Sequence, residues 1–190
     1  MSSTDLNALV AKLNAHSKNA LQAATELCQQ YGHTSVEIEH WLLCLLNEQS
    51  DIYKILQEQQ INTANLGQSL RQQLENFSQS TSTLPTISSN IITWLKEAWL
   101  VTSMRGDTNI RSADLLLGLL QSQHLKQLLN LIHKECKVLT FDIAQALSAK
   151  TIDLQQSEGL ESSHKNIMKT LSKTPNLDEY TINLNQLALE

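Results

Sequence analysis

"RGDTNIRSADLLLGLLQS", residues Arg105–Ser122, repeats an earlier stretch, "YGHTSVEIEHWLLCLLNE", residues Tyr31–Glu48. With an offset of 74 positions, glycine falls on glycine, threonine on threonine and four leucines on four leucines, and Val36 meets Ile110. The identical pairs are Gly32 with Gly106, Thr34 with Thr108, Leu42 with Leu116, Leu43 with Leu117, Leu45 with Leu119 and Leu46 with Leu120. This agreement indicates an internal duplication, with a period well above the roughly 20–50 residues of solenoid repeats.

Each copy has the pattern of four amphipathic helices, because apolar residues recur at positions i, i+3, i+4 and i+7. The expected helices are Lys18–Gln30, Val36–Asn47, Asp51–Gln59 and Asn65–Phe77 in the first copy, and Asn90–Met104, Ile110–Leu120, Leu125–Ile132 and Phe141–Leu147 in the second. Gly32 and Gly106 are placed to end the first helix of each copy. The expected N-cap residues are Thr34 or Ser35 in the first copy, and Ser88 or Ser89 in the second.

The composition supports an all-α fold. Glycine (5) and proline (2) are scarce among the 190 residues, which argues against a turn-rich β protein, and a hydrophobic share of 41% is enough for a core. We therefore predict a duplicated four-helix unit whose halves pack with approximate two-fold symmetry, since each leaves an apolar face for the other to cover. The "LLCLL" and "LLGLL" strings are apolar all round, which predicts a buried central helix in each copy.

Boundaries follow from the repeat and from changes in composition. The expected parts are an extra amphipathic helix at residues 1–14, the first repeat at 15–77, a connector at 78–87, the second repeat at 88–149, a linker at 150–176 and the start of a further module at 177–190. The linker is polar and serine-rich, with a helical turn at Lys165–Leu171. After it, Tyr180, Ile182 and Leu184 alternate with polar residues, which suits a strand without a partner in this sequence. We expect that the chain was cut from a longer protein.

Several classes of partner and location find no support in the sequence. The formal charge is −5 and no cluster of lysine and arginine is present, which argues against a nucleic-acid partner. The longest apolar run, Trp41–Leu46, is far too short to span a membrane, and no secretory signal begins the chain. The dispersed cysteines Cys28, Cys44 and Cys136 are interpreted as buried, reduced thiols of a cytosolic protein.

No catalytic or metal site is expected. The sequence lacks a phosphate-binding glycine loop of the Walker type, a dinucleotide fingerprint and a Cys-x-x-Cys pair. Glu37, Glu39 and His40 cluster, but His33 is seven residues from His40, whereas a helical zinc site needs two histidines four apart. Acidic residues at this place suit the start of a helix. The "RGD" of Arg105–Asp107 resembles an adhesion tripeptide, but its glycine is expected to end a helix.

The two repeated strings "VEIEHWLLCLL" and "IRSADLLLGLL" resemble the N-terminal domain of the Clp/Hsp100 unfoldases, over about residues 15–150. The leader "LNALVAKLNAHSKNALQAATELC" and the string "WLKEAWLVTSMRGDTNIRSADLLLGLL" are similar to the ClpV branch, which serves type VI secretion. The fold implied is the duplicated four-helix Clp N-domain with an extra N-terminal helix. "SAD" stands where "SGH" is more usual in that branch, a departure at a helix start that should leave the fold unchanged.

The resemblance implies a specific task. ClpV N-domains recognise an N-terminal helix on the large subunit of the type VI tail sheath (VipB/TssC type), so that the contracted sheath is taken apart and recycled. ATP and Mg²⁺ would then belong to AAA+ modules outside this fragment, which itself carries no cofactor and is no enzyme. We expect the fragment to be a monomer, the full-length protein to be a homohexamer, and its location to be the bacterial cytoplasm.

A peptide groove is expected beside the leader helix, whose apolar stripe has no counterpart in the duplicated unit to cover it. Helix Lys18–Gln30 would form the floor and Ile87 the rim, although Ile87 could instead pack on Ile91 or Ile92 as a hydrophobic staple. The candidate groove residues are Leu6, Leu9, Val10, Leu13, Leu21, Ala24, Ile87 and Ile91. The three tryptophans, Trp41, Trp94 and Trp99, are expected in the core, with part of Trp94 available to a groove.

Other functions stay open on the sequence alone. The chain could be the N-domain of a general ClpB-type disaggregase that binds exposed hydrophobic segments of many clients, and selectivity for one peptide would tell the two apart. It could be a stand-alone helical adaptor without an ATPase, against which the unpaired strand at Leu177–Leu187 argues. It could also be an enzyme with an unrecognised site in the groove, but no acid/base pair at useful spacing supports this.

Overall fold

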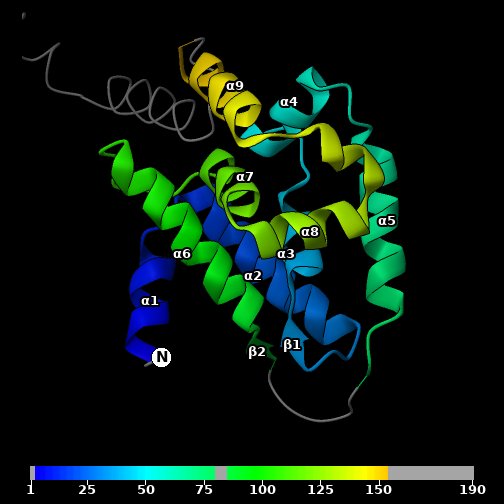
Figure 1. The fold of residues 1–190 in the computed structure, drawn as a ribbon. Coiled ribbons are helices and arrows are strands. Elements are labelled where there is room, and N and C mark those ends of the chain that lie inside the picture. The colour runs from blue at the N-terminus through cyan, green and yellow to red at the C-terminus, as the bar shows by residue number, and fades with distance from the viewer. Residues whose placement is uncertain (1–2, 80–84, 154–190) are drawn as a thin grey trace, which may run out of the picture.

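The computed structural model describes residues 3–79 and 85–153, which fold almost entirely into helices (Figure 1). In chain order the elements are α1 (Ser3–Ala11), α2 (Ala15–Gln30), β1 (Ser35–Val36), α3 (Ile38–Leu45), α4 (Asp51–Glu58), α5 (Thr63–Glu75), β2 (Thr86–Ile87), α6 (Ser89–Met104), α7 (Ser112–Gln121), α8 (Gln123–Ile132), the 3₁₀ helix η1 (Lys134–Val138) and α9 (Phe141–Asp153). The predicted all-α class is confirmed. No helix in the described part of the chain is long and apolar enough to cross a membrane.

The duplication is visible in the helix pairs α2–α3 and α6–α7, which pack closely within each copy. The two glycines that align in the sequence both follow the first helix of a pair, Gly32 with a φ of 69° and Gly106 with a φ of 78°. Positive φ in this range is costly for residues that carry a Cβ atom, so glycine is the residue best suited to end a helix this way. The predicted helix stops are therefore confirmed in both copies.

The two copies are joined crosswise by short backbone pairings. In β1 and β2, Val36 pairs with Ile87 in parallel, and an isolated parallel bridge joins Leu13 to Ile110. The 74-residue offset that relates Val36 to Ile110 also relates Leu13 to Ile87, so the same contact is made twice, each time between different copies. This repetition gives the fold its approximate two-fold symmetry. It also shows that Leu13, at the end of the leader, has a counterpart in Ile87. The prediction from the sequence had assigned the leader no counterpart.

The core is centred on α3 and α7, which follow the two glycines. Every residue of α7 from Ser112 to Leu120 is buried, as predicted for a helix that is apolar all round. In α3 the burial is one-sided, because Leu43 and Cys44 remain half-buried. The rings of Trp41 and Trp94 meet where the copies join, and Trp94 has no exposed surface. The expectation that part of Trp94 lines a surface groove was therefore wrong.

Helix starts differ from the prediction where the backbone is used for contacts between copies. Because Val36 lies in β1, α3 begins only at Ile38, and α7 likewise begins at Ser112, after the bridge at Ile110. In contrast, α2 begins earlier than expected, because the Asn14 side chain accepts a hydrogen bond from Ser17 N and caps the helix. Ser88 caps α6 in the same way, as predicted.

The C-terminal helix α9 is longer than predicted, since it continues past Leu147 to Asp153. Its Lys150 ammonium lies 3.4 Å from both carboxylate oxygens of Glu58 in α4, although both side chains are exposed and such pairs contribute little. The rest of the predicted linker and the predicted strand at 177–190 lie outside the described residues.

Candidate functional site

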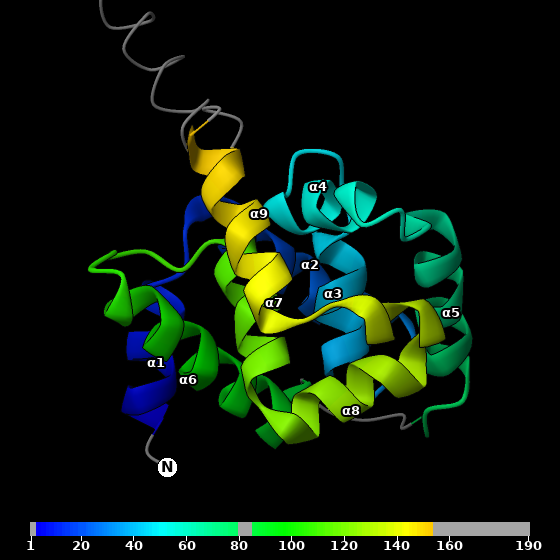
Figure 2. The ribbon, with the colours of Figure 1, turned by 45° about the horizontal axis from the view of Figure 1, so that its top comes forward.

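Helix α1 lies along α6, as Figures 1 and 2 show from two directions. Its apolar stripe, Leu6, Leu9 and Val10, is half-buried and packs against the core. The chain beyond the helix is fixed to the second copy, because Asn14 N donates to Ile110 O at 2.9 Å and Ile110 N donates to Lys12 O at 2.7 Å. The leader is thus an integral part of the fold, and its stripe borders a surface on α6.

A cation–π contact adds a second link between these helices. The Lys12 ammonium lies 5.1 Å from the ring centroid of Trp99, which is half-buried on α6. Such contacts contribute about 0.5–1 kcal/mol at exposed sites. The two residues are far apart in the sequence, and neither belonged to the predicted groove.

The eight predicted groove residues divide into two groups. Leu6, Leu9, Val10 and Ile87 are half-buried and border the surface, whereas Leu13, Leu21, Ala24 and Ile91 are buried. Ala24 and Ile91 have no exposed area and belong to the core, so in this structure they are not accessible to a ligand. Helix α1 packs mainly on α6, whereas the floor of the groove was predicted on α2. Which helix forms the floor stays a prediction.

Ile87 is held at the start of α6 by contacts on both sides. Its backbone pairs with Val36 of the first copy, and the next residue, Ser88, accepts the N–H of Ile91 as N-cap of α6. Leu6, Leu9, Val10, Ile87 and Trp99 are together called the α1–α6 surface below. This surface is apolar and partly exposed, with the exposed charge of Lys12 at one edge.

A separate cavity of about 410 Å³ opens beside the start of α3. Its lining includes His33, Glu37 and Glu39, together with Phe77 and Leu128. Burial raises the pKa of Glu39, and the nearby Glu37 acts in the same direction. None of the eight predicted groove residues lines this cavity, and none lines a second one of similar volume between α3, α4 and α5.

Two histidines stabilise the start of α3 next to this cavity. Glu37 N donates to His40 Nδ1 at 3.0 Å, which closes a capping box. His40 Nε2 therefore carries the ring proton in the neutral form and donates to His33 Nδ1, 2.9 Å away. Burial, with a smaller contribution from His33, lowers the pKa of His40 to about 4. Both rings are buried, so the pair is a neutral structural contact.

In the second copy a carboxylate takes the place of this histidine. Asp114, which aligns with His40, is fully buried, and its carboxylate accepts hydrogen bonds from Arg111 N and from the Arg105 guanidinium. Arg111 also lies 3.3 Å from the buried Asp51 of α4. The "RGD" stretch thus contributes an arginine to a structural ion cluster. Within the described residues, no group of three or more His, Cys, Asp or Glu could hold a metal ion.

Comparison with known proteins places these features in a family. A model of the Clp repeat (R) N-terminal domain matches residues 12–132. The AAA+ ATPase ClpV1 of Pseudomonas aeruginosa is 26% identical over 165 residues, which cover 86% of this chain and 18% of that protein. The chain therefore spans less than a fifth of the length of this relative.

Two solved structures match most of the chain. The N-terminal domain of the ClpV1 ATPase from the E. coli EAEC Sci1 type VI secretion system is 29% identical, with a TM-score of 0.73 over 83% of this chain and 94% of that one. A ClpV N-domain in complex with a VipB peptide is 32% identical, with a TM-score of 0.57 over 75% of this chain and 91% of that one.

Proposed function

The chain belongs to the Clp repeat N-terminal domain family, and we propose that it is the substrate-recognition domain of a ClpV-type ATPase of type VI secretion. Its partner in this proposal is an amphipathic helix at the N-terminus of the large sheath subunit (VipB/TssC type). The observation that carries the proposal is the likeness to a ClpV N-domain that was solved with a VipB peptide.

The α1–α6 surface has the character that this partner requires. An amphipathic helix binds by laying apolar side chains at i, i+3, i+4 and i+7 into an apolar groove. Leu6, Leu9 and Val10 on one side and Ile87 at the start of α6 offer half-buried apolar positions for such anchors. Because α1 is fixed to the second copy through Ile110, the surface is formed before a partner arrives.

The expected affinity is modest. A helix of three or four turns buries an area at or below the low end of standard protein interfaces. We expect a dissociation constant in the micromolar range, which corresponds to about −8 kcal/mol. Weak binding suits a recognition domain that must hand its client on to a motor.

The remaining parts of the task would lie elsewhere in the protein. ATP and Mg²⁺ would be bound by AAA+ modules, which would pull sheath subunits apart in the bacterial cytoplasm as a hexamer. The domain described here would choose the substrate and would carry out no chemistry. Its relative ClpV1, named an AAA+ ATPase, supports this division.

A titration tests the proposal. A fluorescently labelled peptide that copies about the first 20 residues of the cognate large sheath subunit, long enough for several helical turns, is titrated with the domain, and a scrambled peptide and unfolded casein serve as controls. Saturable binding of the native peptide alone supports sheath recognition. Equal binding of casein would replace it with general client recognition, and binding of none would remove the proposed function while leaving the fold unaffected.

A further inference from the structure

Two leucines of α3 stay accessible at positions that are closed in the second copy. Leu43 and Leu46 are half-buried and line the cavity of about 410 Å³ between α3, α4 and α5. Their counterparts in the repeat, Leu117 and Leu120 of α7, are 0% and 5% exposed, because α7 also packs on α4 and α9. The cavity between α3, α4 and α5 therefore has an apolar wall that the duplication alone does not explain.

A glycine in the interior of α5 leaves space beside this wall. Gly67 lines the cavity, and residues 66–70, "LGQSL", align with residues 143–147 of α9, "IAQAL", where Ala144 takes its place. A Cβ atom at Gly67 would meet no atom closer than 3.5 Å, so packing does not require glycine here. Glycine destabilises a helix interior relative to alanine. The position thus keeps open a space that alanine would partly fill, at a cost in stability.

Arg71, one helical turn after Gly67, brings a positive charge to the same point. Its Nη1 atom lies 3.5 Å from the position that a Cβ atom would take at Gly67, and Leu43 Cδ1 lies 3.8 Å from that position. In the part of the chain that the structure describes, no carboxylate lies within ion-pair distance of Arg71. A guanidinium binds a carboxylate through two parallel hydrogen bonds. The cavity therefore offers an apolar contact and an anion contact side by side.

Other polar groups of the lining act in both directions. Thr63 and Ala64 begin α5 and line the cavity, and the first turn of α5 contains no acidic residue to offset the positive end of the helix dipole. The Tyr53 hydroxyl oxygen accepts Gln57 Nε2 at 3.2 Å, which leaves its proton to donate. The exposed Glu48 and the C-terminus of α3 oppose an anion. Removing the Glu48 charge therefore tests the sign of the ligand.

We propose that this cavity binds the C-terminal residue of a peptide that ends in leucine or a side chain of similar size. The apolar side chain lies on Leu43 and Leu46 beside Gly67, and the terminal carboxylate pairs with Arg71. An internal acidic residue fits less well, because only at a C-terminus do the carboxylate and the apolar side chain share one carbon atom, as the adjacent contacts at Gly67 require.

The size and place of the cavity agree with such a ligand. A volume of about 410 Å³ lies near the lower end for ligand sites, which suits a chain end and not a helix that crosses the surface. No residue of the α1–α6 surface lines this cavity. The domain would thus have a second attachment point for a protein chain, and this inference does not depend on recognition of a sheath helix.

An NMR titration of the isotope-labelled 190-residue chain with the peptide acetyl-Ala-Ala-Leu, which has a free carboxylate, tests the proposal. The amide signals of Leu46, Thr63 and Gly67 should shift, with a dissociation constant of about 1 mM. The same peptide with an amidated C-terminus should bind at least about tenfold more weakly, because it cannot form the charge-assisted hydrogen bonds to Arg71.

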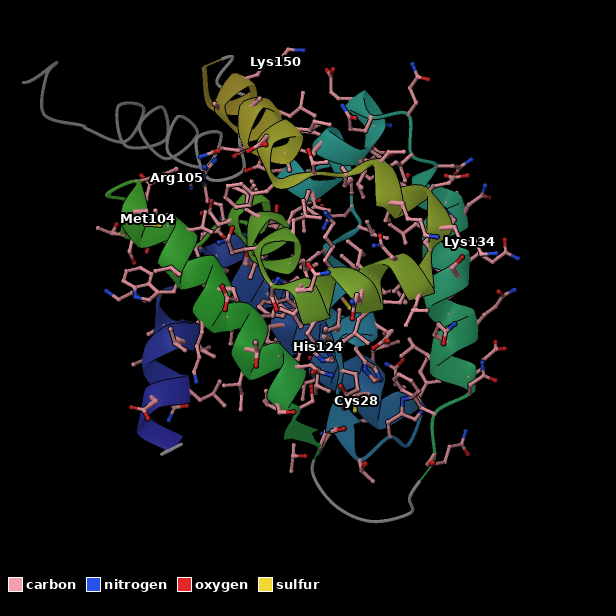
Figure 3. The ribbon with its side chains drawn as sticks, in the orientation of Figure 1. Cys28, Met104, Arg105, His124, Lys134 and Lys150 are labelled. Carbon is pink, nitrogen blue, oxygen red and sulfur yellow. The ribbon has the colours of Figure 1, made fainter. Side chains whose placement is uncertain are left out.

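Four single variants assign the contacts. Arg71→Gln should weaken binding of the free peptide about tenfold, whereas Glu48→Gln should strengthen it. Gly67→Ala should also weaken binding about tenfold, because its methyl group takes the space of the ligand side chain. This variant is expected to be more stable than the parent, so unfolding would not explain the loss. The matched control is Lys134→Gln, at an exposed lysine of η1 on the outer side of the molecule (Figure 3), which should bind like the parent.

Several results would overturn the proposal. Equal binding of the amidated peptide would show that no carboxylate contact exists, and weaker binding by Glu48→Gln would show that the cavity prefers a cation. Binding that survives both Arg71→Gln and Gly67→Ala would place the peptide elsewhere, and the absence of any shift at several millimolar peptide would remove the site. Failure of the sheath peptide to bind in the titration described above would not affect these results.

Discussion

The indole rings of Trp41 and Trp94, one from each copy of the repeat, lie with their centroids 4.7 Å apart and their planes at 56°. Both side chains are fully buried. The Trp41 indole N–H donates to Ser17 O at 3.3 Å, and that of Trp94 donates to Leu115 O at 2.6 Å. The two rings therefore join the copies through a packed aromatic contact while their polar atoms remain satisfied.

Replacing Trp94 by alanine should lower the free energy of unfolding by about 3–5 kcal/mol, because a large cavity forms where the copies meet. Urea denaturation at constant protein concentration measures the change. Trp99→Ala is the comparison, since Trp99 is only half-buried and its loss should cost less. If both substitutions lowered the free energy of unfolding equally, the contact between Trp41 and Trp94 would contribute no more to stability than the half-buried Trp99.

Two buried glycines, Gly118 in α7 and Gly67 in α5, should respond to alanine in opposite directions. A Cβ atom at Gly118 would lie 2.7 Å from Ala98 N and 3.0 Å from Ala98 Cα, so α6 and α7 would be forced apart. Gly118→Ala should therefore destabilise the domain by about 1–3 kcal/mol. At Gly67 the nearest atoms are the ends of flexible side chains, 3.5 Å away or more. Gly67→Ala should stabilise by about 0.5–1 kcal/mol through helix propensity.

Urea midpoints of the two glycine variants and the parent decide this prediction. A neutral or stabilising Gly118→Ala would contradict the close approach of α6 to α7 at Ala98.

Stability should fall as the solution is acidified below about pH 6.5. The pKa of His40 is about 4 in the folded protein and near 6.5 when the chain is unfolded, and the pKa of His33 is lowered in the same direction. Between these values the unfolded chain binds protons that the folded protein does not, so the free energy of unfolding decreases with falling pH. For His40 the loss is on the order of 3 kcal/mol by about pH 4.

His40→Asn should flatten this dependence, because the asparagine oxygen can still accept the Glu37 N–H while carrying no titratable group. His124→Asn, at an exposed histidine, is the matched control and should keep the parent slope. Unfolding free energies at several pH values between about 4 and 7 give the comparison. An unchanged slope in His40→Asn would assign the acid sensitivity to other groups.

The stability of the domain should depend strongly on Asp114, one of the two buried carboxylates of the ion cluster. Asp114→Ala would leave the Arg105 guanidinium and Arg111 N without this acceptor, and breaking a buried pair from one side costs about 3–5 kcal/mol. Asp107, at 3.2 Å from Arg105, has a side chain that is 48% exposed. Asp107→Ala should therefore cost less than about 1 kcal/mol. Thermal unfolding of both variants measures the difference, and similar melting temperatures would count against a structural role for the cluster.

The duplicated pattern predicted the helices well, because the same apolar spacing occurs in both copies and each copy supports the assignment in the other. The starts of α3 and α7 were missed for a physical reason. Val36 and Ile110 pair with backbone from the other copy, and no local signal in the sequence shows that a residue is used in this way. The cap at Asn14 could have been found, since asparagine is a favoured N-cap residue.

The candidate site was predicted in outline only. The stripe Leu6, Leu9 and Val10 was identified from its spacing, but spacing does not say which helix it packs on, and α6 rather than α2 is that helix. Ala24 and Ile91 are equally apolar, yet both are fully buried, a distinction that only tertiary packing makes.

The affinity of the sheath helix for variants of the α1–α6 surface is the most direct measurement. With Val10→Arg or Ile87→Arg, a charge replaces a half-buried apolar anchor, and the native sheath peptide should bind at least about tenfold more weakly, a loss of about 1.4 kcal/mol or more. Circular dichroism should show that the fold is kept, and Leu131→Arg on α8 should bind like the parent. If neither Val10→Arg nor Ile87→Arg changes the dissociation constant, the peptide does not bind at the α1–α6 surface.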